Sequence, residues 1–180
     1  LGPSWEHVNT AGAGGERLLL LRIGNRATPA PKPVLFAMTA IHAREYTTAE
    51  LGLRFGEHLL QNYGRDADAT WILDHQVVQL LVQSNPDGRK QAQTGLSWRK
   101  NTNTGYCGAT SNSRGADLNR NYPFAWNTVA GGSSGNPCEA TYRGPSPGSE
   151  PETQAVVNHV RNTFADLRGD AMSDPAPDDL

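Results

Sequence analysis

The sequence predicts an α/β fold whose sheet contains parallel strands. Two short apolar runs, at 33–41 and 77–82, are expected to form buried strands, and residues 48–63 between them have the spacing of an amphipathic helix. This order of strand, helix and strand favours a right-handed crossover between parallel strands. The chain has 180 residues, enough for one domain, because a chain of this size buries roughly 70% of its unfolded surface.

The remaining elements follow from local patterns. An earlier strand is expected over 17–24, and a proline-rich turn at 29–33 leads into the next strand. In the 48–63 helix, Gly64 suits the C-terminal cap. The residues Asn85-Pro86-Asp87-Gly88 are expected to end the 77–82 strand as a turn. The apolar positions assigned to the core face of the helix are Leu51, Phe55, Leu59 and Leu60.

Residues 90–148 show almost no apolar periodicity and predict a long loop, which in a compact domain is usually functional or disordered. A helix is expected next, with Ser149 as N-cap and Glu152 completing a capping box. Beyond Gly169 the chain is rich in Asp and Pro, and no element is expected there. Aromatic residues that favour an ordered loop are Trp98, Tyr122, Phe124 and Trp126, and those assigned to the core face of the helix are Val156, Val157, Val160 and Phe164.

Composition excludes some functions. The net charge of −2 gives no basis for binding nucleic acid or an anionic membrane. No apolar run reaches the ~18 residues of a membrane-spanning helix. The sequence begins at Leu1 without a signal peptide, so we expect a processed chain or a fragment. Frequent Gly and Pro suit a loop-rich secreted protein.

The two cysteines, Cys107 and Cys138, both lie in a polar stretch rich in Gly, Ser and Asn. Free cysteines prefer burial, so a disulfide is the first interpretation, and two unrelated thiols are the alternative. Closing a loop of about 30 residues would contribute on the order of 3–4 kcal/mol in the chain-entropy model. A disulfide also implies an oxidising compartment, which predicts a secreted or periplasmic protein.

His42 and Glu45 follow the 33–41 strand directly. Imidazole nitrogen and carboxylate oxygen are ordinary zinc ligands. Residues three apart on a strand point to opposite faces, so the chain must turn between them if both bind one ion. A chance pairing of one His with one Glu is the alternative. A third ligand would be needed, and the other histidines sit in no recognisable ligand pair: His7, His58, His75 and His159.

Two basic motifs lie in the long loop, Trp98-Arg99-Lys100-Asn101 and Asp117-Leu118-Asn119-Arg120-Asn121. An arginine fork binds a carboxylate in a bidentate manner. A metal together with an arginine can stabilise a tetrahedral oxyanion. Each arginine alone would more commonly form a surface salt bridge. Together with the metal pair they indicate a site that grips a free carboxylate and hydrolyses the adjacent amide.

These motifs resemble those of the zinc metallocarboxypeptidases of the carboxypeptidase A/B/T family. Six stretches occur in the family order: His42-Ala43-Arg44-Glu45, Asn85-Pro86-Asp87-Gly88, Trp98-Arg99-Lys100-Asn101, Asp117-Leu118-Asn119-Arg120-Asn121, Thr141-Tyr142-Arg143-Gly144-Pro145 and Ser149-Glu150-Pro151-Glu152-Thr153. The resemblance implies an α/β fold with a mixed, mostly parallel central sheet and helices on both faces, incomplete in this chain.

The resemblance also implies a role for each matching residue. His42 and Glu45 would be two ligands of one Zn²⁺, and Arg44 would line a subsite for the substrate backbone. Arg99 would hold the oxyanion. The substrate's terminal carboxylate would be bound by Asn119 and Arg120. Cys107 and Cys138 match a disulfide position of animal members of the family, whereas Thr102 departs from the basic residue usual there.

The family's third zinc ligand and its general-base Glu are expected beyond Leu180. Residues 1–180 would then be the N-terminal portion of a single peptidase catalytic domain, inactive alone and completed by the remaining C-terminal part. The implied function is removal of C-terminal residues from peptides by a metal-activated water. The alternatives are a non-catalytic binding relative and a related zinc amidase or endopeptidase, which would not need Asn119 and Arg120.

Overall fold

A computed structural model describes residues 4–9 and 16–165, with side chains from residue 16 onward. Its sheet has the spatial order β1-β2-β4-β3. The strands are β1 (Ser4–Asn9), β2 (Leu18–Ile23), β3 (Val34–Met38) and β4 (Val77–Leu81). Each of the three expected strands is present and slightly shorter than its sequence pattern, whereas β1 was not expected. Strand β3 lies at one edge of the described sheet.

The sheet is mixed, as expected. β3 and β4 pair in parallel, with Phe36 opposite Gln79. The crossover between them contains α1 (Tyr46–Asn62) and α2 (Ala67–His75). The pairs β1–β2 and β2–β4 are antiparallel, so parallel pairing does not predominate among the described strands. A parallel pair needs a long crossover, and between described strands only the β3–β4 connection contains helices.

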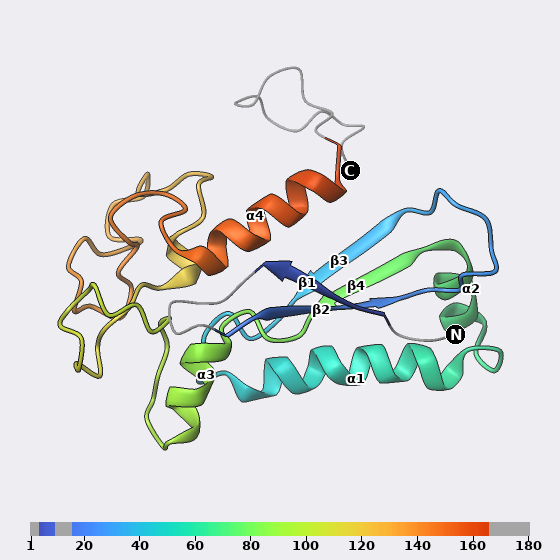
Figure 1. Cartoon of the computed structure of the whole chain (residues 1–180), viewed down its shortest axis with the longest axis horizontal. Coiled ribbons are helices and arrows are strands. Elements are labelled where there is room, and N and C mark those ends of the chain that lie inside the picture. Colours follow the sequence, from blue (N-terminus) through green and yellow to red (C-terminus); the bar gives the residue numbers. More distant parts are fainter. Residues whose placement is uncertain (1–3, 10–15, 166–180) are drawn as a thin grey trace.

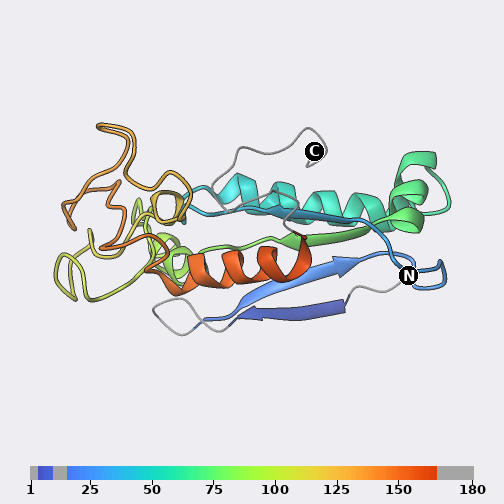
Figure 2. The ribbon, with the colours of Figure 1, turned by 90° about the horizontal axis from the view of Figure 1, so that it is seen from above.

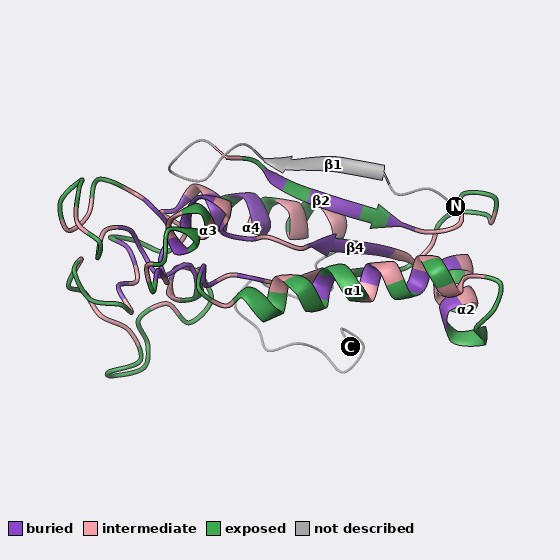
Figure 3. Ribbon diagram, turned by 90° about the horizontal axis from the view of Figure 1, so that it is seen from below, coloured by how far each residue is buried: buried purple, intermediate pink, exposed green. Residues whose placement is uncertain are grey.

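Helices cover both faces of the sheet, as expected. Helices α1 and α2 lie against one face and α4 (Pro151–Thr163) lies along the other (Figures 1 and 2). Strands β2 and β4 are therefore mostly buried between the layers (Figure 3). The core on the α1 side is formed by Leu21, Ile23, Leu59, Ala69, Leu73, Val78 and Leu80. The core on the α4 side is formed by Leu18, Leu20, Leu81, Ala155 and Val156.

Helix α1 follows its predicted bounds closely, and Gly64 just beyond it has the left-handed φ of +76° that favours glycine. Its core face is narrower than the apolar spacing suggested. Leu59 is buried, but Leu51 is 66% exposed and lies beside the uncovered edge of β3 in an apolar cavity of ≈ 330 Å³. None of the helices in the described part of the chain is both long and apolar enough to cross a bilayer.

The turn expected at 85–88 instead opens a helix, α3 (Pro86–Gln93). Asn85 is its N-cap, and the Asn85 side-chain oxygen accepts a hydrogen bond from the Gly88 amide at 3.0 Å. Pro86 occupies the first turn, where the missing N–H costs nothing. The sequence reading was wrong here because Asn and Pro suit a turn and a helix start equally well.

The capping box expected at Ser149 and Glu152 is also absent. Helix α4 has Glu150 as N-cap, with no hydrogen bond from the side chain to the helix. The Ser149 hydroxyl donates to Glu150 at 2.8 Å instead, and Glu152 accepts from the buried Asn101 amide at 3.2 Å. Both glutamate side chains accept hydrogen bonds from residues outside the helix, and neither caps the helix N-terminus. Phe164, assigned to the core face, lies past the helix end and is 38% exposed.

Residues 94–150 contain no described helix or strand apart from a short 3₁₀ helix, η1 (Leu118–Arg120). This segment gathers at one end of the sheet, beside the first turns of α1 and α4 (Figure 1). Buried Glu150 organises it, because its carboxylate accepts hydrogen bonds from Asn101, Asn103 and Tyr106 at 2.8–3.0 Å. The long loop is therefore an ordered part of the fold.

Candidate active site

His42 and Glu45 come together through a turn that follows β3. Ala40 has a left-handed φ of 54°, which redirects the chain after the strand. The Glu45 amide then donates to the His42 carbonyl at 3.1 Å. As a result His42 Nδ1 lies 2.8 Å from Glu45 Oε1. The turn required for two ligands of one ion is thus present, and strained backbone of this kind is common at functional sites.

Asp117 joins His42 to Arg99. Its Oδ1 lies 3.2 Å from His42 Nε2, and its Oδ2 accepts hydrogen bonds from Arg99 Nε and Nη2 at 3.1 and 2.9 Å. The Asp117 side chain is fully buried. Burial by itself would raise its pKa, but the hydrogen bonds from His42 and Arg99 outweigh burial, so the pKa lies below its ordinary value. Asp117 is therefore an ionised acceptor that orients both side chains.

No role was assigned to Asp117 from the sequence, although it opens a motif quoted there. The sequence feature that could have pointed to Asp117 was its position two residues before Asn119 in a polar loop. Its contact with His42 spans 75 residues of sequence, and no local pattern reports such a distance.

Gly115 allows Asp117 to approach Arg99. Gly115 has a φ of +93°, and a Cβ there would lie 2.1 Å from the Asn101 carbonyl oxygen. Without a side chain, the chain passes close enough for the Asn101 amide to donate to the Ala116 carbonyl at 3.0 Å. The segment after Gly115 is thereby fixed beside the segment that carries Arg99.

Asn85 connects the turn that carries His42 to the Arg99 segment. Its side-chain amide is fully buried and donates to the carbonyls of Ile41 and Lys100, at 3.2 and 3.0 Å. The Ala43 amide also donates to the Arg99 carbonyl at 3.2 Å. These hydrogen bonds fix the segments that carry His42 and Arg99 relative to each other.

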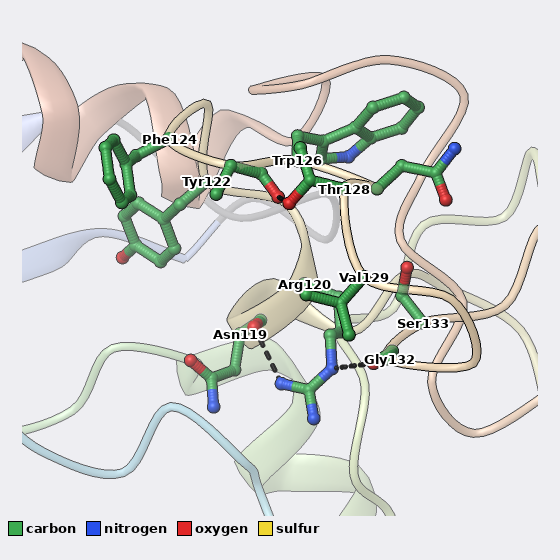
Figure 4. Close-up of a pocket in the computed structure, with 11 residues that line it drawn as sticks. Asn119, Arg120, Tyr122, Phe124, Trp126, Thr128, Val129, Gly132 and Ser133 are labelled. Atoms are coloured by element: carbon green, nitrogen blue, oxygen red, sulfur yellow. Dashed lines mark hydrogen bonds between the residues drawn. The ribbon is translucent and has the colours of Figure 1, made fainter.

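Asn119 and Arg120 lie on η1, directly after Asp117. The Asn119 amide donates to Asp117 Oδ1 at 3.0 Å. Arg120 donates from Nε to the Gly132 carbonyl at 2.8 Å and from Nη1 to the Asn119 carbonyl at 2.9 Å. Both side chains line a cavity of ≈ 290 Å³ that also contains Tyr122 and Phe124 (Figure 4). Asn119 further lines a cavity of ≈ 400 Å³ together with Glu45.

Arg44 points elsewhere. It is exposed, and its Nη1 donates to the Ser97 hydroxyl at 3.2 Å. It shares a separate cavity with Arg99. The predicted site residues thus gather at one end of the sheet but line different cavities, and Asp117 contacts Arg99, His42 and the Asn119 amide.

The chemistry of His42 and Glu45 suits zinc. One imidazole nitrogen and one carboxylate oxygen face each other, and the second imidazole nitrogen is occupied by Asp117. Residues 4–9 and 16–165 contain no group of three or more His, Cys, Asp or Glu that could hold a metal ion. Three other histidines make contacts elsewhere: His58 with Asn62, His75 with Trp71 and His159 with Gln79.

Cys107 and Cys138 form a disulfide with a Cα–Cα distance of 4.9 Å. This distance falls within the usual range of ~4.4–6.8 Å. The bond ties two parts of the long loop together next to the Arg99 segment, since Cys138 lines the same cavity as Arg99.

Comparison with known proteins decides the family. A family model described as zinc carboxypeptidase matches residues 7–173. The chain belongs to the zinc carboxypeptidase family. This confirms the resemblance inferred from the six motifs.

Among curated relatives, the chain is 36% identical over 161 residues to metallocarboxypeptidase A of Trichophyton tonsurans, covering 88% of this chain and 36% of that protein. Thrombin activatable fibrinolysis inhibitor has a similar solved structure, with a TM-score of 0.77 and 28% identity over 89% of this chain and 39% of that one. The solved structure of carboxypeptidase A from Helicoverpa armigera is similar with a TM-score of 0.74 and 28% identity. That match covers 89% of this chain and 38% of the other. The chain therefore spans little more than a third of these zinc carboxypeptidase relatives.

Proposed function

We propose that this chain is the N-terminal portion of a single catalytic domain of a zinc-dependent carboxypeptidase that removes residues from peptide C-termini. One observation carries the proposal: the buried carboxylate of Asp117 contacts both His42 and Arg99, and Asn119 and Arg120 follow it directly in the chain. A metal pair, an oxyanion donor and a carboxylate fork are thus parts of one hydrogen-bonded unit.

His42 and Glu45 would hold the zinc ion, with a third protein ligand from residues other than those the structure describes. When bound, zinc would polarise the scissile carbonyl and lower the pKa of water. Asp117 would keep His42 in the tautomer and orientation that present Nδ1 toward Glu45. This outer contact would also raise the basicity of the imidazole.

The arginines would bind different parts of the substrate. Arg99 is pre-positioned by Asp117, so its guanidinium would stabilise the developing oxyanion without reorganisation. Asn119 and Arg120 would bind the terminal carboxylate. Among the described residues, Arg120 Nη2 donates to no group, which leaves part of the fork for the ligand. Arg44 would contact the substrate backbone beside Arg99. The Cys107–Cys138 bond favours an oxidising compartment, secreted or periplasmic.

The carboxylate role is tested by Arg120→Ala in the full-length protein. We expect kcat/KM for peptides with a free C-terminal carboxylate to fall roughly 10- to 100-fold, because charge-assisted hydrogen bonds are lost. Zinc content should not change. Arg65→Ala, an exposed arginine in the α1–α2 turn, is the matched control and should behave as wild type. Equal cleavage of amidated and free peptides by the wild type would favour the amidase or endopeptidase alternative instead.

Asp117→Asn tests the hydrogen bond to His42. Asparagine keeps the shape but not the charge, and its NH₂ group cannot accept from His42 or Arg99. We expect zinc affinity to fall about 10- to 100-fold, as for other outer partners of metal ligands. Competition with a chelator measures this directly. An unchanged zinc dissociation constant would contradict the role given to Asp117.

A further inference from the structure

A small cavity beside Arg99 is lined by several basic side chains and by no acidic one. It has a volume of ≈ 160 Å³ and is walled by parts of three segments, 97–100, 112–114 and 138–140, together with Arg44. We call it the basic cavity. Its basic residues are Arg44, Arg99, Lys100 and Arg114. Its volume suits one side chain of a ligand rather than a folded partner.

Arg114 belongs to none of the six family motifs, yet it is firmly placed. Its Cζ lies 4.6 Å from the centroid of the Trp98 ring, and Trp98 is only 3% exposed because it packs in the core with Ala43 and Ala92. Arg114 Nη1 donates to the Ser111 carbonyl at 2.9 Å. Its buried Nε has no hydrogen-bond partner in the described part of the chain. The guanidinium is thus held over the ring, and its Nη2, which donates to no described group, remains for a ligand.

The charges in the basic cavity are only partly compensated. Arg99 is paired with Asp117, but Arg44 and Arg114 form no ion pair within the described residues. Lys100 Nζ donates to the carbonyls of Pro137 and Glu139, at 2.8 and 3.1 Å. Burial lowers the pKa of Lys100 to about 8, so it remains mainly charged at neutral pH. The negative charges of Asp117 and Glu139 act on Lys100 but lie outside the lining of the cavity. Carbonyls and a hydroxyl do not neutralise a cation, so four basic groups against these two carboxylates leave the cavity attractive to an anion.

The position of the basic cavity indicates which part of a substrate would reach it. Asn119 and Arg120, which would hold the terminal carboxylate, line other cavities. Arg99, which would act at the bond to be cleaved, lines the basic cavity and is joined through Asp117 to the Asn119 amide. A peptide that runs from Arg120 past Arg99 therefore continues toward Arg44 and Arg114. This side corresponds to residues preceding the scissile bond.

We propose that the basic cavity binds an acidic side chain of the peptide substrate on the N-terminal side of the scissile bond, with Arg114 as the specificity-determining residue. The proposal rests on the proposed function. The disulfide supports the cavity, because Cys138 is part of its wall and Cys107 holds that wall in place. The guanidinium held over Trp98 keeps Nη2 as a charge-assisted donor that a carboxylate accepts.

Steady-state kinetics on the full-length, zinc-loaded protein test this. Peptide pairs would differ only by Glu or Gln, placed in turn at the first, second and third residues preceding the scissile bond. At one position we expect kcat/KM to favour Glu about tenfold at low salt, with the ratio falling as ionic strength rises. Arg114→Gln should bring the ratio near one while kcat/KM for the Gln peptide and zinc content stay unchanged.

Arg65→Gln, remote from the cavity, is the matched control and should keep the wild-type ratio. A wild-type ratio at or below one at all three positions overturns the proposal, as does an undiminished ratio in a folded Arg114→Gln variant. Near-ultraviolet circular dichroism confirms folding. If neither peptide of any pair is cleaved, the proposed function fails instead. Equilibrium binding of the same peptides, with the same expected ratio, then decides this inference alone.

Discussion

We expect Glu45→Ala in the full-length protein to lose zinc and peptidase activity together. Glu45 Oε1 lies 2.8 Å from His42 Nδ1, so the substitution removes one of the two side chains proposed as zinc ligands. Loss of an outer partner typically costs about 10- to 100-fold in metal affinity, and loss of a direct ligand should cost more than that. His42→Ala should have the same effect and would also leave the Asp117 charge without one of its partners. Metal analysis and peptide hydrolysis on the same sample measure both.

Glu57→Ala is the matched control for this expectation. Glu57 is also a glutamate associated with α1, but it pairs with Arg54 at the surface. It should keep full zinc content and activity. If the protein is active without any divalent metal, or if His42→Ala retains normal zinc and activity, the assignment of a zinc site to this turn is wrong.

The second large effect is expected for Arg99→Ala. Removing one preorganised oxyanion donor typically lowers kcat by ~10²–10³. Arg99 is held by two hydrogen bonds to Asp117, and its side chain is 16% exposed, so its charge is poorly screened. We expect the loss in kcat rather than in KM, because the interaction strengthens as charge develops on the carbonyl oxygen. Zinc content should be retained, which separates this variant from Glu45→Ala.

Arg99→Lys provides the conservative comparison. Lysine keeps the positive charge but cannot reproduce the paired Nε and Nη2 contacts with Asp117. An intermediate kcat is expected if position and charge both matter. A kcat for Arg99→Ala within about threefold of the wild type would exclude the oxyanion role on the scale set by known donors. The melting temperature of each variant shows whether loss of a partner for Asp117 also weakens the fold.

Local sequence patterns were sufficient for several features. The β3 and β4 runs with a helical pattern between them predicted the parallel pair, because side-chain periodicity reports secondary structure directly. The need for a turn between His42 and Glu45 followed from the two-residue period of a strand. The family was recognised from six short motifs, since those motifs combine residue types that one chemistry requires.

Where a local pattern had two solutions, tertiary contacts chose between them. Asn85-Pro86 could begin a turn or a helix, and the structure has the helix. In this arrangement the buried Asn85 side chain also donates hydrogen bonds to the carbonyls of Ile41 and Lys100. Ser149 and Glu152 could form a capping box, but the Glu152 carboxylate instead accepts a hydrogen bond from the buried side-chain amide of Asn101. A buried hydrogen bond formed in low dielectric outweighs a solvent-exposed cap.

The sequence by itself determined the α/β class, the strands that pair in parallel and the need for a turn between His42 and Glu45. Only the tertiary structure decided the strand order β1-β2-β4-β3 and the role of Asp117. It also placed Arg114, which belongs to none of the six motifs, against Trp98. The physical reason is range. Periodicity and turn chemistry act over a few residues, whereas Asp117 meets His42 across 75 residues of sequence. Gly115 likewise lets the segment that carries Asp117 approach the backbone of Asn101.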